Sequence, residues 1–133
     1  MSSSFDASNF ATEWVAAWNS HDLEAILVHH APQVVLTSPV AARLTGETSG
    51  TIQGKDALRR YFPKGLELFP NLDFTLIDVM EGLSSVVVYY ENHRDTRTGE
   101  FMEFDDEGKV VRVVANYSIA ESHYLGTVSR RLR

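Results

Sequence analysis

Residues 85–119 read SVVVYYENHRDTRTGEFMEFDDEGKVVRVVANYSI, and this stretch decides the fold. It alternates runs of β-branched and aromatic residues, which suit extended strands, with short polar turns. One turn is the loop over 95–98 and another is Glu107-Gly108, and connections this short join antiparallel neighbours. A further run before Glu81-Gly82 fits the same pattern. The predicted strands of this antiparallel sheet cover 72–80, 85–93, 99–106 and 109–119.

Upstream of these strands the apolar residues recur with helical spacing. Phe10, Trp14 and Trp18 share one face of a predicted helix that Asp6 or Ser8 caps. Pro63 lies inside another predicted helix, where it should cause a kink or a division into two short helices. The expected elements are helices over 6–20, 22–30 (closed by Pro32) and 56–69, strands over 34–38 (ended by Pro39) and 51–52, and a polar loop over 40–50. Three helices followed by an antiparallel sheet indicate an α+β fold with the helices on one face.

Length and composition set the class of protein. The 133 residues suit a single domain over 1–133, with flexible ends expected at 1–5 and 124–133. The absence of cysteine excludes disulfides, a thiol nucleophile and a thiolate metal site. A net charge of -6 argues against binding to nucleic acid, and no apolar run reaches the ~18 residues of a membrane helix. We therefore expect a cytoplasmic protein that binds neither nucleic acid nor membrane.

Four motifs, in this order along the chain, resemble the nuclear transport factor 2-like superfamily. Residues 14–23, WVAAWNSHDL, are similar to its opening helix, and the strand that ends in Ser38-Pro39 resembles its first strand. GKDAL at 54–58 and EGKVV at 107–111 resemble the start of its third helix and the hairpin before its last strand. The similarity spans about residues 8–119 and is closest to the ketosteroid isomerase and SnoaL-like polyketide cyclase branch. It implies a cone-shaped curved sheet that encloses a pocket against three N-terminal helices, and a homodimer that pairs through the outer face of the sheet.

Alternation along the strands assigns the pocket-facing side chains. In the family register, His93 faces outward with Val87, Tyr89 and Glu91. The inward set is Val86, Val88, Tyr90, Asn92, Glu100, Met102, Phe104, Val111, Val113, Ala115 and Tyr117. An apolar cavity with a few polar groups is the usual composition of a small-molecule site. The predicted ligand-binding residues are Trp14, Trp18, Ser38, Tyr90, Asn92, Met102 and Tyr117, and the predicted ligand is a small, largely apolar molecule.

The resemblance does not carry the isomerase chemistry with it. In that family an aspartate moves the proton, while a tyrosine and a protonated carboxylic acid hold the oxyanion. The matching positions here are Ser38, Trp14 and, for the acid, the region of Glu100. A serine without a partner does not abstract a carbon-bound proton at neutral pH, and an indole offers only a hydrogen-bond donor. Glu100 is therefore the catalytic candidate, because an apolar cavity raises the pKa of a carboxyl group.

Several alternatives stay open at this stage. Glu100 is either a pocket acid or a strand-end residue that is solvated or paired with Arg94 or Arg97. Asp78 is either a second acid–base candidate or a carboxylate at the strand end or dimer face. Tyr90 and Tyr117 either orient a ligand or belong to the core. His29 and His30, adjacent on a predicted helix, do not converge on a metal, and no metal or cofactor is expected. The chain is an enzyme of isomerase, cyclase, dehydratase or hydrolase type, a ligand-binding module, or a dimerisation domain.

Overall fold

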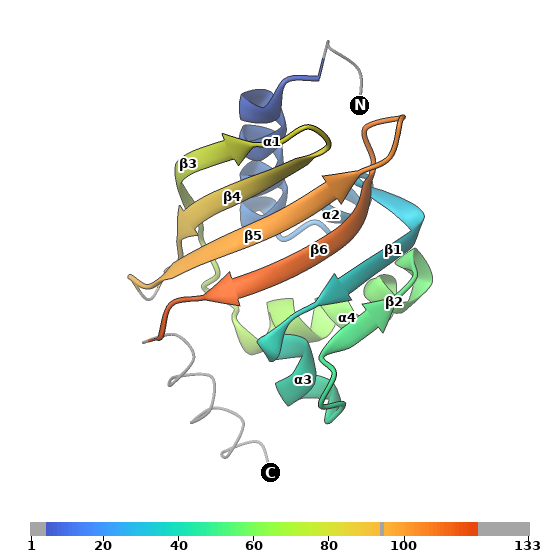
Figure 1. Cartoon of the computed structure of the whole chain (residues 1–133). Helices are drawn as coiled ribbons and strands as arrows, with labels where there is room; N and C mark the ends of the chain where they lie inside the picture. The colour runs from blue at the N-terminus through green and yellow to red at the C-terminus, as the bar shows by residue number, and fades with distance from the viewer. Residues whose placement is uncertain (1–4, 94, 120–133) are drawn as a thin grey trace.

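A curved sheet with helices on one face forms the protein, as the computed structural model shows for residues 5–93 and 95–119 (Figure 1). The helices are α1 (Ala7–Ser20), α2 (Leu23–Leu27), α3 (Pro39–Thr45) and α4 (Lys55–Leu68). The strands are β1 (His30–Thr37), β2 (Thr51–Gln53), β3 (Thr75–Glu81), β4 (Ser85–Glu91), β5 (Arg97–Phe104) and β6 (Val110–Tyr117). The α+β prediction is confirmed. Most of the residues predicted to be flexible, 1–4 and 124–133, lie outside the described part of the chain, and the ring of Phe5 lies 4.8 Å from that of Phe104.

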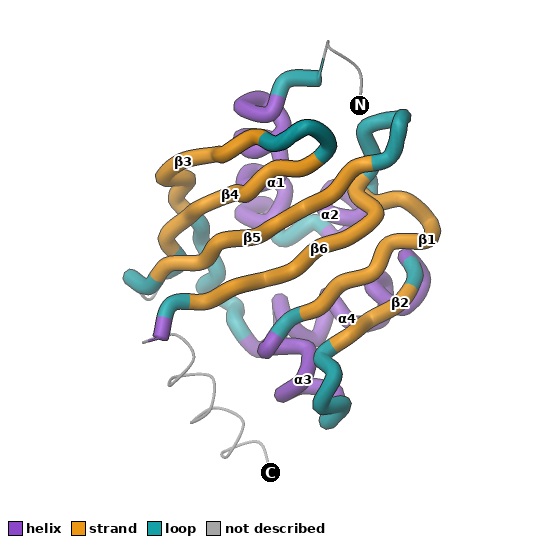
Figure 2. The backbone as a smooth tube through the Cα atoms, viewed as in Figure 1, coloured by secondary structure: helices purple, strands orange, loops and turns teal. Residues whose placement is uncertain are grey.

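The sheet has the order β2-β1-β6-β5-β4-β3 (Figure 2). The strands β3 to β6 form the predicted antiparallel meander. The strand β1 pairs in parallel with β6, so it extends the sheet beyond the last strand of the meander. The helices α1, α2 and α4 lie behind the sheet in the view of Figure 1, and α3 lies beyond the end of β1, so no described helix covers the other face of the sheet.

Local chemistry explains the first helix. The Asp6 carboxylate accepts a hydrogen bond from the Asn9 backbone N–H at 3.0 Å, which caps α1 as predicted. The helix ends at His21, which adopts the left-handed conformation with φ 59°. Its ring lies 2.8 Å from the Leu72 carbonyl oxygen and so ties the end of α1 to the segment before β3.

Three predictions about the first half of the chain need correction. Residues 40–50 are not a loop throughout, because Ser38 caps α3 and Pro39 occupies its first turn. Proline suits that position, since its missing N–H would have no helical partner there. Pro32 does not close a helix, because α2 ends at Leu27 and Pro32 lies within β1. At Pro63 the sequence predicts a kink or two short helices, and the second alternative is wrong, since α4 runs continuously from Lys55 to Leu68.

Within the strands of the meander, the predicted alternation is confirmed except at one position, and His93, beyond the end of β4, is a second exception. Of the inward set, Val86, Val88, Tyr90, Asn92, Glu100, Met102, Phe104, Val113 and Ala115 are buried. Val111 is the exception, since Val110 takes the buried place. The cause is a register shift, in which Glu103 pairs with Arg112 but Phe104 pairs with Val110, so that Val111 is an extra residue on β6.

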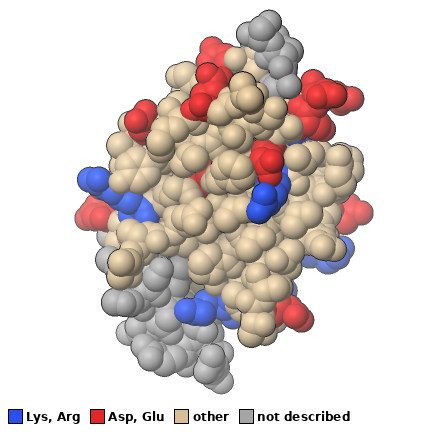
Figure 3. All heavy atoms as spheres, in the orientation of Figure 1, with Lys and Arg blue, Asp and Glu red and all other residues tan. Residues whose placement is uncertain are grey.

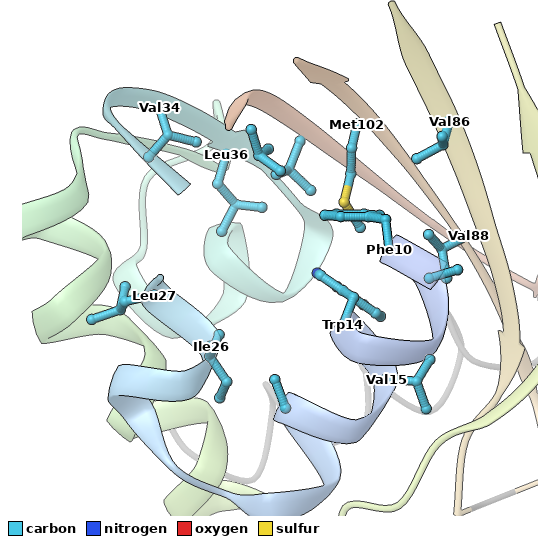
Figure 4. Close-up of a cluster of buried hydrophobic side chains, with 14 of the residues drawn as sticks. Phe10, Trp14, Val15, Ile26, Leu27, Val34, Leu36, Val86, Val88 and Met102 are labelled. Carbon is cyan, nitrogen blue, oxygen red and sulfur yellow. The ribbon is translucent and has the colours of Figure 1, made fainter. Parts of the chain in front are cut away.

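Side chains from α1, α2 and the sheet fill the narrow part of the cone. Phe10 packs edge to face on Phe104, with ring centroids 4.9 Å apart. Figure 4 shows Phe10 beside Met102, with Val86 and Val88 on the strand next to them. This packed end leaves the opposite part of the concave face free for a cavity.

Candidate functional site

A cavity of about 110 Å³ lies between the concave face of the sheet and the helices α1, α3 and α4. Its apolar and aromatic lining consists of Trp14, Trp18, Leu36, Val40, Phe62, Gly65, Phe69, Leu72, Phe74, Val113 and Ala115. Its polar lining consists of His30, Ser38, Tyr61, Tyr90, Asn92, His93, Thr98, Glu100 and Tyr117. No lysine or arginine of the described chain belongs to this lining, so the cavity offers no permanent positive charge to an anion.

The pair formed by Glu100 and Tyr90 is the chemical centre of the cavity. The Tyr90 hydroxyl donates a hydrogen bond to Glu100 Oε1 at 2.9 Å, and both side chains are buried. Within the described residues no hydrogen bond reaches the second carboxyl oxygen, Oε2. Glu100 is therefore held at one oxygen and open to a ligand at the other. The alternative of a solvated or Arg97-paired Glu100 is wrong, because Arg97 lies on the outer face and donates to the Tyr89 hydroxyl at 3.3 Å. Arg94 lies outside the described residues.

Burial changes the acidity of both members of this pair. Desolvation raises the pKa of Glu100 from 4.5 to about 7, and the hydrogen bond from Tyr90 opposes this effect only in part. The pKa of Tyr90 is raised well above its ordinary value, first by burial and then by the charge of Glu100. The pKa of Tyr61 on α4 is also raised by burial and by Glu100. Both phenols therefore remain protonated donors at neutral pH, beside a carboxyl group that is poised between its two states.

Aromatic rings hold Tyr90 in place. Its ring lies 4.2 Å from that of Phe74 and 5.5 Å from that of Trp14. Phe74 and Trp14 are themselves stacked, with centroids 6.0 Å apart. The segment that carries Phe74 is tied to α1 by Asn19, whose side-chain oxygen accepts from the Phe74 N–H at 2.7 Å. Packing against these rings restricts the orientation of the Tyr90 phenol and therefore fixes the geometry of its hydrogen bond to Glu100.

Ser38 and Asn92 line the cavity as predicted, but each already has structural partners. The Ser38 hydroxyl accepts from the Val40 N–H at 3.1 Å as the cap of α3. The Asn92 side chain closes the turn between β4 and β5, donating to the Thr96 hydroxyl at 2.8 Å and accepting from the Thr96 N–H at 3.3 Å. Both side chains shape the wall and the opening of the cavity.

Two predicted site residues lie elsewhere. Met102 does not line the cavity, because its inward position on β5 falls at the packed end beside Phe10 (Figure 4). Asp78 is exposed on the edge strand β3 and accepts a hydrogen bond from the adjacent Val79 N–H at 2.8 Å. A register shift between Leu76 and Asp78 turns this carboxylate away from the interior. A pocket acid–base role for Asp78 is therefore wrong.

Four further polar lining residues were not predicted as pocket residues: Thr98 on β5, His30, His93 and Tyr61. His30 begins β1 instead of ending a helix, and only 3% of it is exposed. His93 was assigned to the outer face, but β4 ends at Glu91, so strand alternation no longer applies to it. Tyr61 enters from α4, where its spacing with Leu58 and Phe62 already marked an apolar face. Among the described residues no group of three or more His, Asp or Glu side chains converges as a metal site.

The comparisons with known proteins agree with this architecture. The family model of the SnoaL-like domain matches residues 11–122. A SnoaL-like protein of unknown function from Burkholderia thailandensis is 35% identical, with a TM-score of 0.80 over 84% of this chain and 93% of that chain. Two more distant structures share the fold.

One of them is a putative isomerase of the SnoaL-like family from Agrobacterium tumefaciens (15% identity, TM-score 0.68, 84% of this chain and 97% of that chain). The other is TerC, co-crystallised with polyporic acid (18% identity, TM-score 0.71, 90% of this chain and 98% of that chain). No curated protein matches the chain. The family match over most of the chain, together with the cone of helices and sheet, shows that this protein belongs to the SnoaL-like domain family.

Proposed function

We propose that the chain binds a small, largely apolar, carbonyl-bearing molecule in its cavity, and that Glu100 performs cofactor-independent acid–base chemistry on it. The observation that carries this proposal is the hydrogen bond of 2.9 Å from Tyr90 to a Glu100 carboxyl group inside an aromatic cavity. A carboxyl group in a cleft whose pKa is strongly perturbed by desolvation and a specific partner is a functional-site candidate. The co-crystallisation of TerC with polyporic acid supports a ligand role for a cavity in this fold.

The size and charge of the cavity restrict the ligand. A cavity of about 110 Å³ restricts the ligand to a small molecule, such as a single ring with short substituents. Because no lysine or arginine of residues 5–93 and 95–119 lines the cavity, a carboxylate or phosphate would face Glu100 without a described positive charge to compensate it. An uncharged ring that carries a carbonyl group fits both restrictions.

The carboxyl group suits either direction of proton transfer. A general acid or base works best when its pKa is close to the working pH, and the pKa of Glu100 is about 7. In its protonated form Oε2 donates to a ligand carbonyl oxygen, and in its ionised form it accepts a proton from the neighbouring carbon. Tyr90 stays protonated throughout and stabilises the negative charge on Oε1.

Isotope exchange tests this proposal directly. Uncharged cyclic and aryl ketones are incubated with the protein in D₂O, and ¹H NMR follows the loss of the protons on the carbon beside the carbonyl group. We expect exchange with the wild type and none with Glu100→Gln, which keeps its shape and its bond to Tyr90. Glu103→Gln is the matched control, because Glu103 lies on the same strand but faces outward and pairs with Arg112 at 3.0 Å.

The outcomes separate the competing functions. Undiminished exchange in Glu100→Gln would remove Glu100 from the mechanism. Saturable binding by the wild type without exchange would favour the second candidate, a sequestering protein, which the aromatic wall alone can support. Failure of every ketone to bind would contradict the ligand proposal and favour a dimerisation domain.

We also propose that two copies pair through the outer face of the sheet. Half-buried Val87, Phe101 and Val114 are direct cross-strand neighbours on β4, β5 and β6. Figure 3 shows this face as largely uncharged, with most of its acidic and basic side chains near the rim. No described helix is both long and apolar enough to cross a membrane. A cytoplasmic location stays a prediction.

A further inference from the structure

We infer that His30 is a second polar anchor of the cavity, whose Nε2 accepts a hydrogen bond from a ligand hydroxyl or N–H group, so that the ligand is an elongated molecule with a donor at one end and a carbonyl oxygen at the other. This inference rests on the proposed function, because it assigns the Glu100 end of the same cavity to the carbonyl group. It adds a specificity-determining residue and the polarity of the molecule that fits.

The position of the His30 ring fixes which nitrogen carries the proton. Nδ1 lies 3.1 Å from the Ile26 carbonyl oxygen at the last turn of α2. A carbonyl oxygen only accepts, so Nδ1 is the donor, and in the neutral ring Nε2 keeps its lone pair. The ring packs on Phe62 with centroids 5.8 Å apart, which restricts its rotation. His30 is thus a rigid hydrogen-bond acceptor in the wall of the cavity.

The surroundings keep this ring neutral. Burial lowers the pKa of His30 to about 4, and the charges of His29 and Lys55 act in the same direction. The carbonyl oxygens of Ile26 and Leu27 oppose them without prevailing. At neutral pH the side chain therefore offers a lone pair and no positive charge, so it selects for a donor group and not for an anion.

The sheet register places His30 and Glu100 at different depths of the cone. His30 pairs with Val110 at the start of β6, whereas Glu100 pairs with Ala115 further along the same strand. At about 3.3 Å per residue these backbone levels are roughly 15 Å apart, and the two side chains reach into one cavity from them. A molecule that contacts both groups must be elongated, with its polar atoms at opposite ends.

A structural role explains only one of the two ring nitrogens of His30, namely Nδ1. The bond from Nδ1 to Ile26 joins α2 to β1, and an asparagine at this position would provide it equally well, because its amide nitrogen occupies the place of Nδ1. The nitrogen Nε2 takes no part in that joint. Glutamine has the opposite property, since its amide group reaches the place of Nε2. These two substitutions therefore separate the joint from the anchor.

Two single-ring ketones of equal size provide the test, 4-hydroxyacetophenone and 4-methylacetophenone. Their binding to the wild type, His30→Asn and His30→Gln is measured by isothermal titration calorimetry. One hydrogen bond to Nε2 should make the wild type bind the hydroxyl probe about three- to tenfold more tightly than the methyl probe. His30→Asn should bind both probes equally and keep the wild-type affinity for the methyl probe, whereas His30→Gln should keep the preference.

A nitrogen resonance gives a second readout that does not depend on how well the variants fold. In ¹⁵N-labelled wild type, the Nε2 signal of His30 should move on addition of the hydroxyl probe and stay in place with the methyl probe. Equal affinity of the wild type for the two probes, or an unmoved Nε2 signal at saturation, would overturn the inference while leaving the proposed function intact. If neither probe bound to the wild type while other uncharged ketones did, the inference would be overturned and the proposed function would stand. If no uncharged ketone bound, both would be contradicted.

Discussion

Replacing Glu100 with glutamine should change the pH dependence of folding stability in a way that reports the pKa of this one group. Glutamine has the same shape, accepts the same bond from Tyr90 and carries no ionisable proton. The wild type and Glu100→Gln therefore differ chiefly in whether a carboxyl group with a pKa of about 7 titrates inside the cavity.

The sign and size of the effect follow from linkage. The pKa of Glu100 is about 7 in the folded protein against 4.5 as the reference value, so the folded state holds a proton that the unfolded state releases between these values. The free energy of unfolding must therefore fall as the pH rises through this range, and its full decrease is reached above pH 7. A shift of this size corresponds to about 3 kcal/mol. The free energy of unfolding of Glu100→Gln, minus that of the wild type, should rise by about 3 kcal/mol from pH 4 to pH 8.

A second buried group titrates in the same range with the opposite sign. The pKa of His30 is lowered from 6.5 to about 4, so its contribution to stability is present above pH 6.5 and is lost as the pH falls. The wild-type curve alone would mix the two effects. Because both proteins contain His30, the difference between them isolates Glu100.

Urea denaturation at half-unit pH intervals, followed by circular dichroism, measures this difference. A ¹³C titration of the Glu100 carboxyl carbon gives the pKa independently, with Glu100→Gln identifying the signal. A difference in stability that stayed constant from pH 4 to pH 8, or a carboxyl group that titrated near 4.5, would refute the assignment of Glu100 as a desolvated acid. The proton chemistry proposed for the cavity would then lose its basis.

Three more predictions concern the proposed dimer interface and the backbone of the fold. Val114→Glu should convert the expected dimer into a monomer, as measured by light scattering, because it places a charge at the centre of the apolar outer face. The helical circular dichroism signal should be unchanged. A monomeric wild type would contradict the proposed pairing. Gly50→Ala should lower stability in thermal denaturation by about 1–3 kcal/mol, because Gly50 has φ +61° and a Cβ there would lie 2.5 Å from the Ser38 carbonyl oxygen. Gly65→Ala, inside α4 with no atom within 4 Å of its Cβ, should instead raise stability by about 0.5–1 kcal/mol, and a loss equal to that of Gly50→Ala would show that the close contact is not the cause.

The antiparallel meander could be predicted from the sequence because its signals are local. Alternating burial along β4 and β5 and the short turns between strands are properties of adjacent residues, and they place Tyr90 and Glu100 on the same inner face. The bulge at Val111 could not be predicted in this way. No residue type in β6 signals the extra residue, and only the pairing of β6 with β5 shows where it lies.

Errors in the N-terminal half have a different cause, because residues there have two local roles. Pro39 fits the end of a strand and also the first turn of a helix, and the capping bond of Ser38 decides for the helix. His30 fits the end of an apolar helix as well as the start of a buried strand, and its pairing with Val110 decides for the strand. Contacts between distant segments settle such cases, so the sequence pattern alone missed α3 and one wall of the cavity.

The residue at position 38 affects the acidity expected of Glu100. In the isomerases that the sequence resembles, the residue at the place of Ser38 removes the proton and the acid at the place of Glu100 stays protonated. Here that position holds Ser38, which caps α3, and the described lining of the cavity contains no carboxylate besides Glu100. Without a neighbouring negative charge, the pKa of Glu100 is raised by burial alone and reaches only about 7. A single carboxyl group at that value is ionised in about half of the molecules at neutral pH, which is why we propose Glu100 as the base that the site otherwise lacks.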